Sequence, residues 1–187
     1  MRVKNGDVRY LALLRGINVG GRNMVKMPDL RTCFGRLGFN NVTTYIQSGN
    51  VLFDCRLKNP SRLSVVIEEA LAAELGCAPA VVIVPEEQLA RVVRQAPPAF
   101  GTEPVAYRYD VVFLRPPVRA RDVLPTVSLK AGVDEAFEAN EVLYLKKLNA
   151  RASQSHFPKL VGSAAYKSMT VRSWYTTTEL YRLISSQ

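Results

Sequence analysis

The segment "NVTTYIQSGNVLFDC", residues 41–55, constrains the fold more than any other, because it has the pattern of two strands joined by a tight turn. β-Branched and aromatic residues flank Ser48-Gly49, and the glycine supplies the positive φ that a two-residue turn requires. The segment therefore predicts an antiparallel hairpin.

The elements around this hairpin are predicted from apolar periodicity and from proline and glycine at helix ends. We expect a buried strand over residues 8–15, a helix from Pro28 to Gly38, a helix over residues 60–75 and a buried strand over residues 80–84. The order strand, helix, strand, strand, helix, strand is that of the split βαβ pattern. It predicts an α+β fold with a ferredoxin-like N-terminal half.

The segment "QAPPAFGTEP", residues 95–104, is rich in proline and glycine and is the expected domain boundary. We therefore predict a ferredoxin-like subdomain over residues 1–97, packed with a second, smaller α+β subdomain over residues 98–187. In the second part, "YRYDVVFL" predicts a strand, and two further strands are expected to pair across Asn140-Glu141. This half is interpreted either as a degenerate echo of the first or as an irregular α+β unit, since no motif recurs between the halves.

Composition limits the classes of site. The chain has 187 residues, three cysteines and one histidine. The cysteines cannot all pair and show no C-x-x-C spacing, and a multi-histidine metal site is excluded, so we expect no metal and no cofactor. No apolar run approaches the length of a membrane span, and no secretion signal is found at the N-terminus, which favours a cytoplasmic protein with no membrane partner.

The charge of the chain is its one unusual global property. Lysine and arginine number 25 against 16 acidic residues, which gives a net charge of +9. A basic surface concentrates anions, including nucleic acid and phosphorylated metabolites. The excess is spread over both halves, with 13 basic and 8 acidic residues in 1–97 and 12 and 8 in 98–187, so a merely solvated surface stays open as the alternative.

The stretch "LLRGINVGGRNM", residues 13–24, places three glycines directly after the first strand. It does not fit the dinucleotide fingerprint G-x-G-x-x-G or the P-loop pattern. In a ferredoxin-like sheet, however, the end of the first strand lies beside the start of the third. This predicts a ligand-binding edge that is made of Arg15, Asn18, Gly20, Gly21, Gln47, Ser48 and Asn50.

This set of residues suits an anion, because a guanidinium binds phosphate bidentately and consecutive backbone N–H groups form a concave nest. The alternative is an inert turn. In that case the glycines only permit positive φ, and Asn18 and Asn50 only satisfy turn backbone.

Several motifs together resemble the bacterial domain-of-unknown-function 1697 family. These are "ALLRGINVGG", Met27, Leu30, "LGF", "TYIQSGNVLF" and "TVRSW" with Thr177 and Leu180. The resemblance spans nearly the whole chain and implies a cytoplasmic α+β protein with no assigned activity. It places emphasis on the predicted edge together with Gly16 and Gly49, and adds Thr170, Arg172 and Trp174 near the C-terminus.

One position departs from the family pattern. The family reads Arg-Asn-Trp where this chain has Ser173 between Arg172 and Trp174. If that asparagine orients a ligand in the family, the serine weakens the case for assigning the same role to Ser173. If it caps a turn, serine can do the same.

Three functions follow from these observations. The first is binding of a phosphate-bearing small molecule or of a nucleic-acid backbone at the predicted edge, with Arg172 and Trp174 as candidate further contacts. Base stacking of the RNA-recognition type is disfavoured, because "YLALLRG" and "GNVLFD" offer mainly aliphatic side chains.

The second is an enzyme acting on a phosphorylated or acyl-phosphate substrate, by analogy of fold with small acylphosphatases, in which Arg15 or Arg22 would hold phosphate and Asn50 would position water. A triad of His156 with Ser153 or Ser155 is arithmetically open, but neither serine lies in a G-x-S-x-G elbow. The third is a protein–protein adaptor. The sequence assigns no catalytic residue and no oligomeric state.

Overall fold

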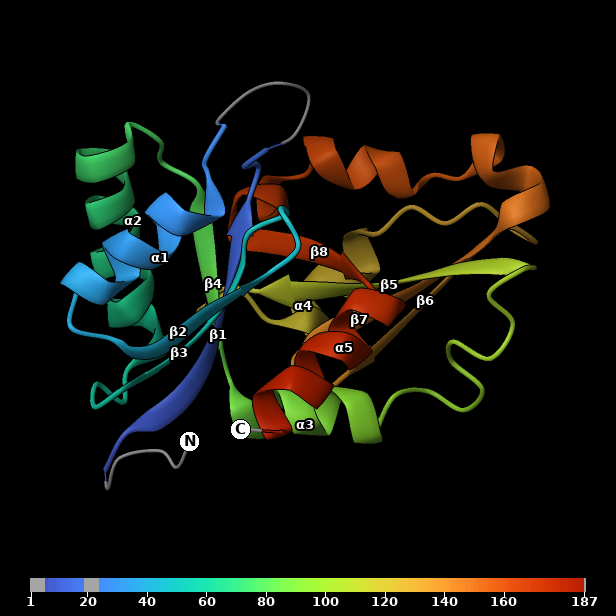
Figure 1. Cartoon of the computed structure of the whole chain (residues 1–187). Helices are drawn as coiled ribbons and strands as arrows, with labels where there is room; N and C mark the ends of the chain where they lie inside the picture. The colour runs from blue at the N-terminus through green and yellow to red at the C-terminus, as the bar shows by residue number, and fades with distance from the viewer. Residues whose placement is uncertain (1–5, 19–23, 187) are drawn as a thin grey trace. The chain divides into compact units, whose positions relative to one another are not determined.

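The computed structural model describes residues 6–18 and 24–186. It divides into two compact units, Met1–Leu89 with Arg182–Gln187, and Ala90–Tyr181. Each unit contains one four-stranded antiparallel sheet (Figure 1). The α+β prediction is therefore confirmed. The division between the units after Leu89 lies ahead of the proline-rich segment, residues 95–104, in which the sequence places a boundary, and the C-terminal residues return to the first unit.

The first unit has the elements that the sequence predicts. They are β1 (Val8–Arg15), α1 (Met27–Arg36), β2 (Asn40–Tyr45), β3 (Asn50–Cys55), α2 (Pro60–Leu75) and β4 (Ala80–Pro85). The strands lie in the order β2-β3-β1-β4, with the first strand between the third and the fourth. This order is consistent with the ferredoxin-like interpretation.

Local chemistry fixes the ends of α2. The side chain of Asn59 accepts a hydrogen bond from the backbone N–H of Arg62 at 3.0 Å, and Pro60 occupies the first helical position. At the other end Gly76 adopts a φ of 63°, the left-handed conformation that ends many helices. Both ends agree with the sequence prediction.

The core of the first unit lies between its sheet and the helices α1 and α2, which cover the same face (Figure 1). Alternate residues of β1 point into this core, namely Tyr10, Ala12 and Leu14. The ring of Phe53 on β3 stacks on Phe39 with centroids 4.6 Å apart. The centre of the sheet is therefore closely packed against the helices.

The three cysteines of this core, Cys33, Cys55 and Cys77, are buried. Burial raises the pKa of the Cys33 thiol to about 11. The thiolate is the reactive form of cysteine, so this side chain is inert packing at neutral pH.

The hairpin between β2 and β3 differs from the prediction. Tyr45 pairs with Asn50, so the connection contains four residues, Ile46 to Gly49, and the predicted two-residue turn is wrong. Ile46 and Gly49 both adopt positive φ, at 48° and 76°. The sequence signal at Ser48-Gly49 located the turn correctly but not its length.

The second unit repeats the strand order of the first. Its elements are β5 (Tyr107–Leu114), α4 (Ala120–Val123), β6 (Asp134–Ala139), β7 (Val142–Leu148) and β8 (Met169–Ser173), in the order β6-β7-β5-β8. The predicted pairing across Asn140-Glu141 is confirmed, since Ala139 pairs with Val142.

The connection between β7 and β8 differs from its counterpart in the first unit. Where α2 stands in the first unit, the second has three 3-10 helices, η2 (Asn149–Gln154), η3 (Phe157–Gly162) and η4 (Ala164–Ser168). Two further helices, α3 (Glu86–Arg94) and α5 (Trp174–Ser185), each span a division between the units.

Candidate functional site

The end of β1 lies beside the β2–β3 loop, as the sequence predicts. Leu13 pairs with Asn50, and the backbone N–H of Leu14 donates to the carbonyl oxygen of Gly49 at 2.8 Å. Arg15, the next residue of β1, therefore lies at the same edge of the sheet as the loop. We call Arg15, Gly16, Asn18 and the loop 46–49 with Asn50 the β1–β3 edge.

Asn18 connects the two segments of this edge. It adopts a positive φ of 53°, and its side-chain amide donates to the carbonyl oxygens of Val25 and Gln47, both at 2.9 Å. Its Oδ1 accepts the backbone N–H of Val25 at 2.7 Å. Both N–H groups of the amide are thus used, and the contacts give Asn18 a positioning role.

Asn50 closes the loop in a similar way. The side chain is completely buried, and its amide nitrogen donates to the carbonyl of Tyr45 at 3.1 Å and to the Oγ of Ser48 at 3.0 Å. Both N–H groups of this amide are therefore committed to the loop. The asparagines hold the edge in shape, as the inert-turn alternative also requires.

The groups of the edge that reach solvent are different ones. Gly16 and Gln47 are exposed, and Arg15 and Ser48 are half-buried. A guanidinium, an amide and a hydroxyl thus lie within a short stretch of partly exposed chain. The predicted contributions of Gly20 and Gly21 lie outside the described residues.

Arg172 and Trp174 belong to the second unit, whereas Arg15 belongs to the first. Arg172 is buried, and its Nη1 donates to the Oγ1 of Thr170 at 2.7 Å and to the carbonyl of Val171 at 2.8 Å. Burial lowers the pKa of Arg172 to about 10, so the guanidinium stays charged at neutral pH.

Trp174 lies in an aromatic cluster of the second unit. Its ring meets the edge of Phe100 with centroids 5.2 Å apart and that of Tyr144 at 6.5 Å. Gly101 passes so close that an added Cβ would overlap the indole. These contacts give Trp174 a packing role within its unit.

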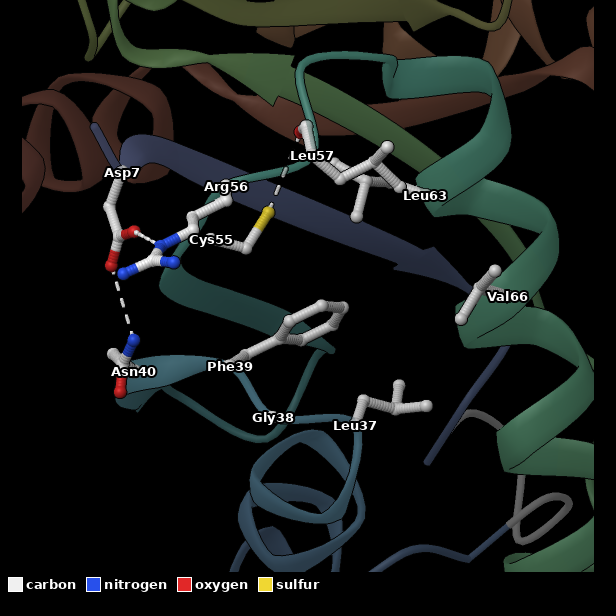
Figure 2. A pocket seen from close by; sticks show the side chains of 10 residues that line it. All are labelled: Asp7, Leu37, Gly38, Phe39, Asn40, Cys55, Arg56, Leu57, Leu63 and Val66. Carbon is white, nitrogen blue, oxygen red and sulfur yellow. Dashed lines mark hydrogen bonds and ion pairs between the residues drawn. The ribbon is translucent and has the colours of Figure 1, made fainter.

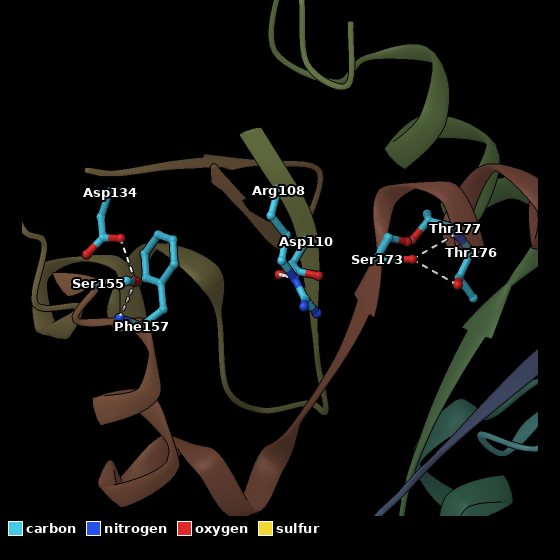
Figure 3. Close-up of polar contacts among 8 residues, drawn as sticks. All are labelled: Arg108, Asp110, Asp134, Ser155, Phe157, Ser173, Thr176 and Thr177. Atoms are coloured by element: carbon cyan, nitrogen blue, oxygen red, sulfur yellow. Dashed lines mark hydrogen bonds and ion pairs between the residues drawn. The ribbon is translucent and has the colours of Figure 1, made fainter. Parts of the chain in front are cut away.

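Ser173 caps a helix. Its Oγ accepts the backbone N–H of Thr176 at 3.1 Å at the start of α5, and the hydroxyl of Thr177 donates to the Ser173 carbonyl at 3.0 Å (Figure 3). Serine and asparagine are both good N-cap residues. In this chain Ser173 therefore fills the cap position itself.

The sequence left a Ser-His-Asp triad open, and the structure does not form it through Ser155. The hydroxyl of Ser155 donates to Asp134 at 2.6 Å, while Nδ1 of His156 lies 3.0 Å from the Oγ of Ser128. Asp134 instead accepts the backbone N–H of His156 at 2.8 Å (Figure 3 shows Asp134 with Ser155). The carboxylate organises a turn and does not orient the imidazole.

The cluster around Asp134 predicts a pH effect on stability. Burial raises the pKa of this carboxyl, but hydrogen bonds from Ser155 and from the backbone of His156 and Lys130 outweigh burial and leave the pKa below its ordinary value. A carboxyl with a lowered pKa in the folded state stabilises the fold above the unfolded pKa, about 4. That stabilisation is lost as the pH falls through the lower, folded-state pKa.

We therefore expect Asp134→Asn to lower the free energy of unfolding by about 2 kcal/mol at neutral pH, because hydrogen bonds to a charged acceptor are lost. The difference in free energy of unfolding between the variant and the native chain should become smaller below about pH 4, as the native carboxyl is protonated. Urea denaturation at a series of pH values measures both. Asp122→Asn is the matched control, since Asp122 is exposed and bonded to Arg119 on the surface, and it should lose much less. A loss that does not change with pH would contradict the assignment.

Metal-ligand clusters and membrane-spanning helices are both absent from residues 6–18 and 24–186. No group of three or more histidine, cysteine or acidic side chains there could hold a metal ion. Within the same part of the chain, no helix has the length and apolar character that a bilayer crossing demands.

Comparison with known proteins places the β1–β3 edge within the part of the chain that matches a family model. The model of the family described as "Protein of unknown function (DUF1697)" matches residues 8–144. The chain belongs to the DUF1697 family. The match contains the described part of the edge and ends before Arg172 and Trp174.

A solved structure is similar to this DUF1697 protein over nearly its full length. It is the conserved bacterial protein SP0830 from Streptococcus pneumoniae, with 25% sequence identity and a TM-score of 0.82. The match covers 95% of this chain and 99% of that chain. The comparison with curated proteins gives no match. The fold is therefore shared with a bacterial relative, and the function rests on the site itself.

Proposed function

We propose that this DUF1697 protein binds a phosphate-bearing anion at the β1–β3 edge, through Arg15 with Gly16, Gln47 and Ser48. The observation that carries the proposal is that hydrogen bonds join the two segments of the edge, from Leu14 to Gly49 and from Asn18 to Gln47. A site whose backbone is already fixed loses little conformational entropy when it binds.

The chemistry of these groups favours phosphate. A guanidinium donates two parallel hydrogen bonds to phosphate oxygens, and hydroxyl and amide groups add further donors. The net charge of +9 raises the local concentration of anions around the molecule. A phosphomonoester and a nucleic-acid backbone share this chemistry, and the experiment separates them.

No specific observation favours the alternative of an acyl-phosphate hydrolase. In that mechanism Asn50 would position the attacking water, yet both of its N–H groups already donate to Tyr45 and Ser48. The enzyme and the adaptor both stay predictions of the sequence. Binding is the function that the geometry supports best.

The test is a calorimetric titration of the protein with pyrophosphate and, separately, with a short single-stranded RNA, each at low and at moderate salt. We expect Arg15→Ala to weaken pyrophosphate binding about tenfold or more, because charge-assisted hydrogen bonds are lost. We also expect little change in the melting temperature of the free protein.

Arg62→Ala is the control, because it removes the same charge from an exposed residue in the first turn of α2. If Arg15→Ala and Arg62→Ala weaken pyrophosphate binding equally, the result would contradict a local site. Binding would then be explained by the net positive charge of the protein alone. Binding of RNA alone, with a steep dependence on salt, would assign the edge to a nucleic-acid backbone. Binding of pyrophosphate in competition with RNA would assign it to the phosphate group itself.

A further inference from the structure

A cavity of about 460 Å³ opens on the first unit, at the end of β1 away from Arg15. Its walls come from the segment between α1 and β2, the end of β3 and the first turns of α2 (Figure 2). A volume of this size is within the range of pockets that hold small organic molecules. The cavity takes no part in the proposed phosphate site.

One side of the cavity is apolar. It is formed by Leu37, Phe39, Leu57, Leu63 and Val66 (Figure 2). Phe39 stacks on Phe53 in the core, so its ring is held in place from behind. A preformed apolar wall favours a ligand with a hydrocarbon or aromatic body.

The other side is polar and carries one exposed cation. The carboxylate of Asp7, whose side chain is 2% exposed, accepts the amide N–H of Asn40 at 3.1 Å and lies 3.6 Å from the Nε of Arg56. The side chain of Arg56 is 82% exposed. Asp7 thus orients Arg56 through Nε, and the described residues offer no hydrogen bond to the two terminal nitrogens of the guanidinium.

This arrangement determines the sign of the ligand. The Asp7 carboxylate is almost completely covered and already has a hydrogen bond from Asn40 and an ion pair with Arg56, whereas the guanidinium of Arg56 faces solvent at the rim. An incoming charged group therefore meets the cation first. The terminal nitrogens of arginine fit a carboxylate in a bidentate geometry.

We propose that this cavity binds a small carboxylic acid with an apolar body, its carboxylate on Arg56 and its body against Phe39, Leu63 and Val66. The proposal is independent of the phosphate site, because the two lie at opposite ends of β1. Asp7 and Asn40 act as positioning residues for the guanidinium.

Cys55 supplies a readout within the cavity. It lines the cavity, whereas Cys77 does not, and each is 6% exposed. Burial raises the pKa of the Cys55 thiol, so its alkylation is slow enough to follow. Native alkylation with N-ethylmaleimide, resolved by peptide mass spectrometry, compares the two cysteines in one sample.

The expected result is that octanoate slows alkylation of Cys55 about tenfold at a concentration ten times its Kd, with little effect on Cys77. Arg56→Gln should raise the half-protecting concentration about tenfold or more. Lys58→Gln, an exposed charge that does not line the cavity, is the matched control and should leave it unchanged.

A second pair of variants tests the apolar wall. Val66→Ala should weaken protection by octanoate, while Val65→Ala, on the exposed side of α2, should not. Equal protection of Cys55 and Cys77 would indicate general stabilisation and overturn the proposal. Stronger protection by octylamine than by octanoate would assign the polar end to Asp7 and overturn it as well, and so would the absence of protection by octanoate.

Discussion

Replacing Gly49 by alanine is expected to lower the free energy of unfolding by about 3 kcal/mol, which is large for a change of one methyl group. Gly49 has a φ of 76°, a conformation that costs an L-residue about 1 kcal/mol. An added Cβ would also lie 2.8 Å from the Cβ of Leu14 and 2.9 Å from the Cδ1 of Ile17. Both neighbours are buried and cannot move away freely.

Gly16→Ala is the matched control for this prediction. Gly16 has the same φ of 76°, but among the described residues no atom beyond its two chain neighbours lies within 4 Å of an added Cβ. It should therefore lose only the conformational part, about 1 kcal/mol. Urea denaturation followed by far-ultraviolet circular dichroism measures both variants. Equal losses would show that the contact of Gly49 with β1 does not matter for stability.

The same contact explains why Gly49 matters to the candidate site. Close approach of the loop to β1 is what allows the hydrogen bond from Leu14 to the Gly49 carbonyl. Displacing the loop would also stretch the bond from Asn18 to Gln47. We therefore expect Gly49→Ala to weaken anion binding together with stability, whereas Arg15→Ala acts on binding alone.

Much of the first unit could be predicted because its signals are local. Periodicity and the proline and glycine at helix ends located α1 and α2, and apolar runs located β1 and β4. The antiparallel order then placed Arg15 beside the loop without any further information. Long, regular segments carry their own structural signal in this way.

The details of the edge could not be predicted because they depend on distant partners. The sequence leaves Asn18 open as a ligand contact or as a residue that satisfies turn backbone, and its amide donates to the carbonyls of Val25 and Gln47, which only a folded loop brings within reach. The four-residue turn likewise depends on the pairing of Tyr45 with Asn50, while Ser48-Gly49 alone is typical of a shorter turn.

The cavity beside Arg56 and the turn around Asp134 also lacked a sequence signal. Asp7 and Asn40 are 33 residues apart, and Asp134 and Ser155 are 21 apart. No motif connects members at such separations, and each residue alone has the pattern of an ordinary loop. Such clusters are determined by tertiary packing rather than by local propensity.

Asp54→Ala is expected to be the most destabilising of the substitutions considered, with a loss of about 3 to 5 kcal/mol. Asp54 is completely buried on β3, and its Oδ1 lies 3.4 Å from the Nη1 of Arg9, which is 4% exposed on β1. Its Oδ2 accepts the amide N–H of Asn41 at 2.6 Å. The variant removes the compensating charge beside a buried guanidinium.

A double-variant cycle with Arg9→Met separates the ion pair from the other contacts of Asp54. If the buried charge is the cause, Asp54→Ala should cost less in the Arg9→Met background than in the native chain, since no charged side chain is then left unpaired at position 9. Denaturation midpoints with a common m-value measure the coupling. An equal cost in both backgrounds would instead assign the loss to the hydrogen bond from Asn41. The ion pair between Arg9 and Asp54 would then make no net contribution to the free energy of unfolding.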